Sequence, residues 1–501
     1  GLGAGNVPTF TAGRWAAGSA LVQATNALKG YAVPRPDGTT LSFDCQGLLL
    51  SITDRHDYAL SYRYSTNGLL TNVTDSAGQS LAFSYNASNR LASVTGPGSE
   101  QVTYSYDARG RLTNALHVRS GAERRYAYND QDQLTGVTRF NGLADLEAVP
   151  DLRGRSDELE DGRGNVFEYS FGVDPVTLAT TSTVVDAGAG PDAAWTRETD
   201  ADGRLTSVAD PLGSEVQCAY WGDSLYPNEI RLPDPGRQPL EIVRNAFGLP
   251  LQVEDPENTG GLPVTFSYNA ANLPVSVTNA LGKRTAFGYN ADNDLTSVSR
   301  FLGAVEARTG YGYSGGAVSA VTHPLGHSTR YLRDAVGRIT NVIDATGVRI
   351  GLAYDTVGRV VRISDPRYSA PVTLAYNAFD AVTNITTPAG TVACGYDPAT
   401  HRCTAITNMN GAVTRFEYDP ATGDLLHMVR ENRGYPAVTV SYEYDRFGRV
   451  SKVTLPGGEA TGFAYDELGR VTGRAETDGR PPGPPQVLDS SAADSGVWTN
   501  A

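Results

Sequence analysis

A short tyrosine-led pattern recurs almost from end to end of the chain, and this repetition constrains the fold more than any other feature. In its clearest copy the pattern reads Tyr-Asp-Ala-Arg-Gly-Arg-Leu-Thr, from Tyr106 to Thr113. The steps from Tyr64 to Tyr85 and from Tyr85 to Tyr106 are both 21 residues. A fixed period of this length indicates a repeat architecture built from similar supersecondary units. The tyrosines that lead the copies are Tyr64, Tyr85, Tyr106, Tyr128, Tyr268, Tyr289, Tyr313, Tyr354, Tyr376, Tyr396, Tyr418, Tyr444 and Tyr465.

Each copy predicts a β-hairpin. Tyr104 and Tyr106 are two residues apart, which places both side chains on one face of a strand. The residue after the tyrosine is Asp or Asn, which caps the first position of a type I turn, and Gly or Asn three residues later accepts a positive φ. A second strand follows through Arg111–Thr113. The motif residues of these turns include Asp107, Gly110, Asp355, Gly358, Asp397, Asp419, Asp445, Gly448, Asp466 and Gly469.

One detail does not fit a regular hairpin. Leu91 and Val94 follow the turn after Tyr85, and their odd spacing would place them on opposite faces of the second strand. A β-bulge, or apolar contact on both faces, would explain this spacing.

Arginines commonly follow the turn glycine, and we expect them to have a structural role. From this position a guanidinium can stack on a neighbouring tyrosine or pair with the aspartate of an adjacent turn. The arginines concerned are Arg111, Arg204, Arg338, Arg359, Arg449 and Arg470.

The pattern Tyr-Asp-x-x-Gly-Arg-Leu-Thr, repeated at about this spacing, resembles the YD repeat of the RHS-repeat family. That family includes bacterial polymorphic toxins, the shell subunits of insecticidal toxin complexes and teneurins. The resemblance covers roughly residues 40–475. It implies an all-β fold in which tandem antiparallel hairpins form a long ribbon curled into a hollow or partly open shell. It also implies a secreted or cell-surface protein, whose shell encloses a C-terminal toxic segment in the toxins.

In the family's toxins the shell ends in a core segment with an Asp-Pro-x-Gly cleavage site. Asp397-Pro398 and Asp419-Pro420 resemble the start of that segment, but ordinary repeats resume at Tyr444 and Tyr465. Neither the cleavage site nor a toxin domain can therefore be assigned to this chain.

The period divides the chain into five predicted regions. A degenerate strand-turn region spans 1–40, regular repeats span 41–138 and 265–474, and irregular repeats with longer loops span 139–264. Residues 475–501 form a predicted Pro-rich linker and tail, since the segment Arg480–Pro485 cannot extend a sheet.

Charge and motif content exclude several functions. The net charge of −14 argues against nucleic acid as a partner, and no apolar run is long enough to span a membrane. No catalytic motif and no cofactor-binding loop is recognised. His323 and His327 have metal-ligand spacing, but Pro324 and Gly326 place them around a turn, so we expect no metal site.

The four cysteines are too few for a disulfide scaffold. Cys45 and Cys218 are expected to be buried or partly buried thiols. Cys394 and Cys403 flank one hairpin turn, where they are either a cross-strand disulfide or two reduced hydrophobic side chains.

The resemblance to the RHS-repeat family implies a non-enzymatic shell segment of a large bacterial protein, whose partner is the rest of the parent chain and its C-terminal cargo. The alternative is a carbohydrate-binding or cell-adhesion module, because tyrosine rings can stack on cell-surface glycans. A hydrolase site in the irregular region 139–264 is a third alternative.

Overall fold

In the computed structural model, most of the chain forms antiparallel β-structure. The described residues contain 42 strands and a single turn of 3-10 helix, η1 (Pro97–Ser99). The expected all-β class is thus confirmed. The described ranges are 22–23, 30–35, 37–139, 144–150, 155–188, 194–234, 236–258, 260–303, 305–432 and 434–477.

Most strands have five to seven residues, as short hairpin units require. The first half of the chain contains β1 (Val22–Gln23), β2 (Tyr31–Pro34), β3 (Thr40–Phe43), β4 (Leu49–Thr53), β5 (Ala59–Tyr64), β6 (Leu70–Asp75), β7 (Ser80–Tyr85), β8 (Leu91–Thr95), β9 (Gln101–Tyr106), β10 (Leu112–His117), β11 (Ala122–Tyr128), β12 (Leu134–Arg139), β13 (Ala144–Pro150), β14 (Ser156–Asp161), β15 (Val166–Val173), β16 (Thr180–Asp186), β17 (Ala194–Thr199), β18 (Leu205–Ala209), β19 (Glu215–Ala219), β20 (Glu229–Arg231), β21 (Leu240–Arg244) and β22 (Pro250–Glu254).

The second half continues the same succession of hairpins. It contains β23 (Val264–Tyr268), β24 (Pro274–Thr278), β25 (Arg284–Tyr289), β26 (Leu295–Leu302), β27 (Val305–Ser314), β28 (Ala317–Thr322), β29 (Ser328–Arg333), β30 (Ile339–Ile343), β31 (Arg349–Tyr354), β32 (Val360–Ser364), β33 (Val372–Tyr376), β34 (Val382–Thr387), β35 (Gly390–Tyr396), β36 (Cys403–Thr407), β37 (Val413–Tyr418), β38 (Leu425–Glu431), β39 (Val438–Tyr444), β40 (Val450–Thr454), β41 (Ala460–Tyr465) and β42 (Val471–Thr477).

A β-bulge at the start of the second strand resolves the spacing problem in the sequence. In the β7–β8 hairpin Tyr85 lies opposite Leu91 and Phe83 lies opposite Val94, because the register shifts by one residue beside Tyr85. Leu91 and Val94 therefore share a face although their spacing is odd. The same shift follows the motif tyrosine in other hairpins, including those of Tyr64, Tyr128, Tyr289, Tyr354, Tyr418 and Tyr465.

The turn glycines have the left-handed backbone that the sequence predicted. The φ angles of Gly110, Gly358 and Gly448 are 86°, 91° and 77°. Where asparagine takes the same position, at Asn89 and Asn293, φ is 57° and 65°. The turn position thus selects residues that tolerate positive φ.

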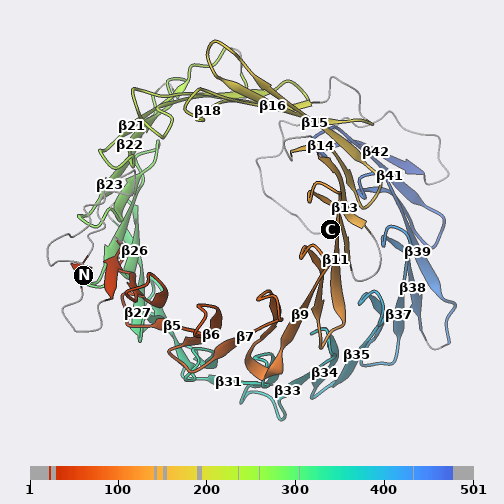
Figure 1. The fold of residues 1–501 in the computed structure, drawn as a ribbon. Helices are drawn as coiled ribbons and strands as arrows, with labels where there is room; N and C mark the ends of the chain where they lie inside the picture. Colours follow the sequence, from red (N-terminus) through yellow and green to blue (C-terminus); the bar gives the residue numbers. More distant parts are fainter. Residues whose placement is uncertain are drawn as a thin grey trace. The chain divides into compact units, whose positions relative to one another are not determined.

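The described residues form two compact units, which are considered separately. Unit 1 comprises residues 1–101, 268–275 and 285–349, and unit 2 comprises 102–267, 276–284 and 350–501. Each unit therefore combines stretches that are far apart in the sequence. In unit 2, strands β11–β14 lie beside strands β37–β42 (Figure 1).

The apolar interior of this sheet is thin. Among the described residues, only Ile242 and Ala460 are buried apolar residues, and each keeps a small exposed fraction. The motif tyrosines are half-buried. The physical reason is that one sheet of short hairpins covers little of itself, so most side chains keep one side in contact with water.

The expected N-terminal region 1–40 and the Pro-rich tail 475–501 lie mostly outside the described residues. Within the described ranges, no helix is both long enough and apolar enough to cross a lipid bilayer.

Candidate functional site in the hairpin turns

The motif aspartates cap the turns that they begin. In the turn after Tyr106, Oδ1 of Asp107 accepts a hydrogen bond from the backbone N–H of Arg111 at 2.9 Å. In the turn after Tyr354, Oδ1 of Asp355 accepts from the backbone of Val357 and Arg359 at 3.1 and 2.9 Å. These contacts agree with the structural purpose that the sequence assigned to the acidic residues.

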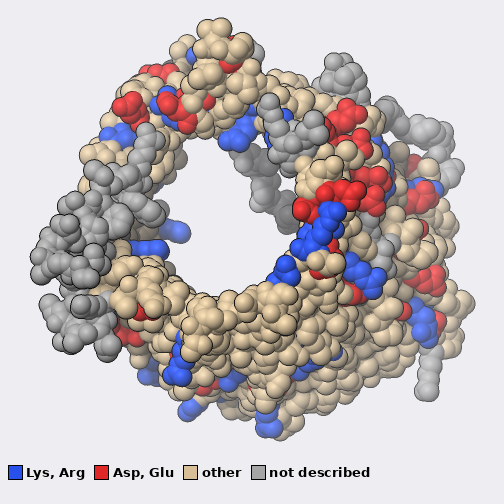
Figure 2. Space-filling model, in the orientation of Figure 1, with Lys and Arg blue, Asp and Glu red and all other residues tan. Residues whose placement is uncertain are grey.

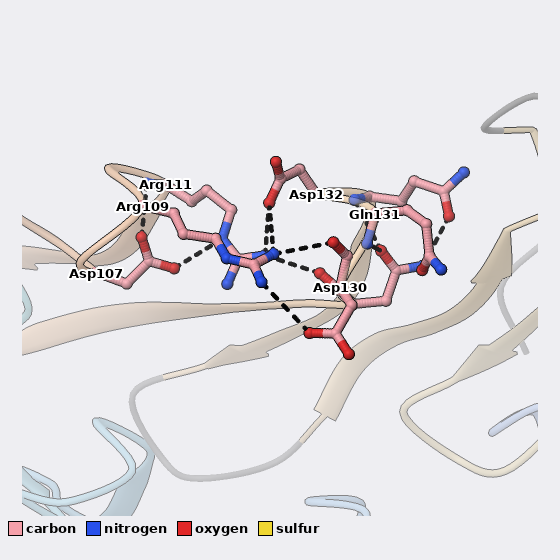
Figure 3. A network of polar contacts seen from close by, with 8 residues as sticks. Asp107, Arg109, Arg111, Asp130, Gln131 and Asp132 are labelled. Atoms are coloured by element: carbon pink, nitrogen blue, oxygen red, sulfur yellow. Dashed lines mark hydrogen bonds and ion pairs between the residues drawn. The ribbon is translucent and has the colours of Figure 1, made fainter.

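The arginine after the turn glycine braces the turn. Nε of Arg111 donates to Oδ2 of Asp107 at 2.7 Å, an ion pair within one turn that the sequence analysis did not predict. Its Nη1 reaches the next hairpin, where it donates to Oδ1 of Asp132 at 3.0 Å (Figure 3). The same within-turn pair forms at Arg204–Asp200, Arg338–Asp334, Arg359–Asp355, Arg449–Asp445 and Arg470–Asp466.

The same guanidinium groups also stack on the next tyrosine. The guanidinium carbon of Arg111 lies 5.0 Å from the ring centroid of Tyr128, and that of Arg359 lies 4.7 Å from the ring of Tyr376. Both expected contacts of these arginines, with an aromatic ring and with a neighbouring turn, are therefore present. Further examples are Arg204 over Tyr220, Arg402 over Tyr418 and Arg449 over Tyr465.

The tyrosine hydroxyls form a ladder between hairpins. Tyr85 donates to the carbonyl oxygen of Leu70 at 2.8 Å, and Leu70 lies opposite Tyr64, the preceding motif tyrosine. Each hydroxyl thus fixes its hairpin to the one before it. The same bond is made by Tyr64, Tyr220, Tyr289, Tyr313, Tyr376, Tyr396, Tyr418, Tyr444 and Tyr465.

The titration of these groups reflects their contacts. Hydrogen bonds from the backbone and guanidinium of Arg111 lower the pKa of Asp107 below its ordinary value. Burial raises the pKa of Tyr418, because the phenolate would lose water. Asp107 therefore stays ionised and Tyr418 stays protonated near neutral pH.

In unit 2, ion pairs join turns that are about 260 residues apart. Arg163 contacts Asp424 with both ends of its guanidinium, at 2.6 and 2.5 Å, across 261 residues. The bidentate geometry of this contact is the strong form of an arginine–carboxylate pair. Nη2 of Arg119 lies 2.6 Å from Oδ2 of Asp380, also across 261 residues. We call this set of contacts the seam of unit 2.

A third seam contact involves a buried asparagine. Arg446 pairs with Asp186, and Nδ2 of the buried Asn165 donates to the backbone carbonyl of Arg446 at 3.0 Å. A Cβ atom on Gly188 or Gly448 would collide with the guanidinium groups of Arg446 or Arg163. The sequence analysis missed these seam residues.

In unit 1, Asp294 joins two distant turns. Its carboxylate is almost fully buried, and its Oδ1 lies 2.8 Å from Nη2 of Arg55 and 3.1 Å from Nε2 of His56. Burial alone would raise its pKa, but Asn290, His56 and Arg55 outweigh burial and lower it. With Asp292, the carboxylate and His56 could surround a cation, but the guanidinium of Arg55 already neutralises the carboxylate.

All four cysteines are free. Cys403 lies opposite Tyr396, and Cys394 lies opposite Ile406, so the two cysteines are diagonal and not directly opposite. The register that pairs Cys403 with Tyr396 sets this offset, because Cys394 lies two residues before Tyr396 on the same strand. A disulfide between the two cysteines stays a prediction. Cys45 is exposed, contrary to expectation, because it occupies the outer part of the turn after β3. Cys218 is half-buried, and burial raises the pKa of its thiol.

His323 and His327 lie at the two ends of one turn, as their sequence predicted, with the N–H of His323 donating to the carbonyl of His327. A separate groove of about 430 Å³ lies over β12–β14 and is lined by Glu147, Glu158 and Glu160. Glu147 lies directly opposite Glu160, and Figure 2 shows acidic side chains gathered over β13 and β14. This face would attract cations.

Comparison with protein families gives a match to the RHS repeat in four segments, residues 85–121, 268–305, 333–370 and 439–481. Five of the six aspartate–arginine braces described above lie within these segments, at Asp107, Asp334, Asp355, Asp445 and Asp466, whereas several ladder tyrosines lie between them. No curated protein matches the chain.

Comparison with solved structures gives similar folds in the crystal structures of TcdB2-TccC3-TEV and TcdB2-TccC3-Cdc42. The TM-scores are 0.50 and 0.51, and each is 12% identical to this chain over 92% of its residues. The chain spans only 36% and 29% of the length of those solved chains. At this identity the likeness concerns the fold.

Proposed function

Because this chain is a member of the RHS-repeat family, we propose that it is a non-enzymatic wall segment that encloses part of a longer protein. The observation that carries this proposal is the use of the motif side chains. In the repeats led by Tyr444 and Tyr465 the aspartate, the arginine and the tyrosine hydroxyl all bind the chain itself, in the same geometry. Side chains that complete a wall are not available to a substrate.

Two further observations support a wall. The ladder couples each hairpin to its neighbour, so the sheet can extend without a large core. The seam of unit 2 joins distant stretches through Arg119, Arg163 and Arg446, which lets separate rows of hairpins form one layer. In this proposal the regular repeats 41–138 and 265–474 form the wall, and 139–264 adds longer loops to it.

The parent protein would be a secreted or cell-surface bacterial protein, and the enclosed partner a C-terminal toxin or effector. The similar fold in the TcdB2-TccC3 structures supports a wall of this kind by analogy of fold alone.

Protease protection tests the proposal. An unstructured reporter peptide is attached after Ala501 and, as a matched control, the same peptide is attached before Gly1. A wall that encloses a C-terminal segment predicts cleavage several-fold slower at the C-terminal position. Equal cleavage rates at the two positions would overturn the enclosing role.

A glycan array tests the alternative of a carbohydrate-binding module. The ladder tyrosines already use their hydroxyls and several of their ring faces within the chain, so we expect no glycan binding. Binding that is lost in Trp221→Ala, which removes an aromatic ring that is 52% exposed, would favour the binding module.

A further inference from the structure

One groove in unit 2 is lined by aromatic side chains from two distant parts of the chain. It has a volume of about 260 Å³ and lies between strands β15–β17 and the turns that follow Tyr444 and Tyr465. Trp195 is 48% exposed, which is unusual for so large an apolar side chain. The groove therefore presents an indole surface to solvent. Its aromatic lining residues are Phe167, Trp195, Phe447 and Tyr465.

The strand register places Phe167 and Trp195 on one face of the sheet. Phe167 lies opposite Asp186 and Trp195 lies opposite Val184, and these two partners are two residues apart on β16. The two rings therefore flank β16, on strands that are about 9.6 Å apart at the usual spacing of about 4.8 Å. Within the described ranges, neither ring stacks on another ring or on a guanidinium.

The other two rings of the groove are already covered by arginines. The guanidinium carbon of Arg446 lies 4.4 Å from the ring centroid of Phe447, and that of Arg449 lies 4.5 Å from the centroid of Tyr465. Each of these guanidinium groups is also paired with a carboxylate, so each is held by one ring and one acid. The acids are Asp186 for Arg446 and Asp445 for Arg449.

The groove also contains a carboxylate that lacks such a partner. Asp466 lines the groove and pairs with Arg470. Glu467 lines it as well, and among the described residues it forms no ion pair. The groove therefore combines an uncovered indole, that of Trp195, with one unbalanced negative charge.

The place of Glu467 relative to the seam of unit 2 explains its missing partner. At the seam, turns about 260 residues apart are joined by a guanidinium and a carboxylate, as Arg163 and Asp424 are. The next pair of facing turns contains Pro211 and Glu467, which line the groove together and are also about 260 residues apart. The turn 210–213 contains no cationic side chain, so the seam lacks its cation at this point.

We propose that this groove binds one arginine side chain of a partner polypeptide, whose guanidinium stacks on the indole of Trp195 and pairs with the carboxylate of Glu467. A guanidinium is planar, stacks on aromatic faces and binds a carboxylate through two parallel hydrogen bonds. These are the two contacts that Arg449 already makes with Tyr465 and Asp445.

The size of the groove and the charge of the chain agree with this occupant. The volume of about 260 Å³ is below the range of roughly 300–1,000 Å³ that is usual for small-molecule sites, so the groove fits a single side chain and not a cofactor. The net charge of −14 favours the approach of a basic partner.

Fluorine NMR on the full chain tests this contact. The protein is labelled with 5-fluorotryptophan, and the signals of Trp195 and Trp221 are assigned with Trp195→Phe and Trp221→Phe. The probe is the tripeptide Gly-Arg-Gly with both ends blocked. The control probe carries citrulline in place of arginine, which keeps the planar shape and removes the charge.

We expect the arginine peptide, at millimolar concentrations, to shift the Trp195 signal until the shift saturates. The citrulline peptide should bind several-fold more weakly. The signal of Trp221, an exposed indole outside the groove lining, should stay in place with both probes.

Two matched variants separate the ion pair from stacking alone. Glu467→Gln should weaken binding of the arginine peptide several-fold. Glu459→Gln removes an exposed glutamate from the β40–β41 turn, at the other edge of the sheet, and should leave binding unchanged. An unchanged circular dichroism spectrum shows that both variants are folded.

Several results would overturn the proposal. No response of Trp195 to the arginine peptide is one, and equal affinity for the citrulline peptide or in Glu467→Gln is another. Equal affinity for a lysine peptide would indicate a site for any cation instead of a guanidinium site. A Trp195 signal that responds only to added oligosaccharide would indicate a glycan site, and one that moves with protein concentration alone would indicate a second copy.

Discussion

Arg163 and Asp424 form a bidentate ion pair between two hairpin turns of unit 2 that are 261 residues apart in the sequence. The side chain of Asp424 is 14% exposed and that of Arg163 is 25% exposed, so water screens this pair less than a surface pair. The contact shows how distant rows of hairpins are held together. A wall built from thin repeats depends on such contacts, because its described residues include almost no buried apolar core.

The first prediction concerns this pair. Arg163→Ala should lower the free energy of unfolding by about 2 kcal/mol, because it leaves the Asp424 carboxylate without its charged partner. Urea denaturation measures the loss. The control is Arg415→Ala, which removes an exposed pair with Glu431 and should cost about 0.5 kcal/mol or less. Equal losses in the two variants would show that the seam does not stabilise unit 2.

The second prediction concerns the tyrosine ladder. Tyr289→Phe removes the hydroxyl that donates to the carbonyl oxygen of Pro274 at 2.9 Å, and should cost about 1 kcal/mol. Tyr289→Ala also removes a half-buried ring and should cost about 3 kcal/mol. Tyr435→Phe is the control, since Tyr435 is 76% exposed. If both variants of Tyr289 melted like the parent, the ladder would have no energetic role.

The third prediction concerns the turn glycines. At Gly337, φ is 82° and a Cβ atom would meet nothing within 4 Å, so Gly337→Asn should be tolerated and Gly337→Val should destabilise. At Gly448 a Cβ atom would collide with the guanidinium of Arg163. Gly448→Asn should therefore lower the melting temperature more than Gly337→Asn. Equal effects of asparagine and valine at Gly337 would refute the assigned turn conformation.

The fourth prediction concerns acid stability. Burial raises the pKa of Asp355, but the hydrogen bonds from Arg359 outweigh burial, so its pKa lies below the ordinary 3.8. A lowered pKa in the folded protein gives a stabilisation that is fully present above pH 3.8 and is lost as the pH falls through the folded value. The contribution of the Asp355 carboxylate to the melting temperature should thus stay constant between about pH 7 and pH 5. The melting temperature should then fall steeply below about pH 3.8. Asp355→Asn should make that acid decline shallower, and an equally steep decline in this variant would contradict the assignment.

The local structure follows from the sequence because its causes are local. The Asp107–Gly110 turn is specified by capping and by the positive φ of Gly110, and the hairpin is specified by the spacing of Tyr104 and Tyr106. A β-bulge was one of two explanations that the odd spacing of Leu91 and Val94 allowed, and it is the one that the structure contains.

The long-range contacts could not be predicted in the same way. Nothing in the turn around Arg163 distinguishes it from other turns, and its partner is 261 residues away. Which turn faces Arg163 depends on the strand twist that accumulates over all the hairpins between the two turns. The sequence of either turn alone therefore does not identify Asp424 as the partner. The aromatic groove lined by Phe167, Trp195 and Phe447 could likewise not be predicted from a local sequence pattern, because its walls come from separate hairpins.

Small-angle X-ray scattering tests the central claim, that the chain forms a wall around a cavity. A solid domain of 501 residues has a radius of gyration of about 23 Å. The wall predicts a larger radius and a distance distribution depleted at the centre of the particle. A compact profile with a radius of gyration near about 23 Å would contradict it.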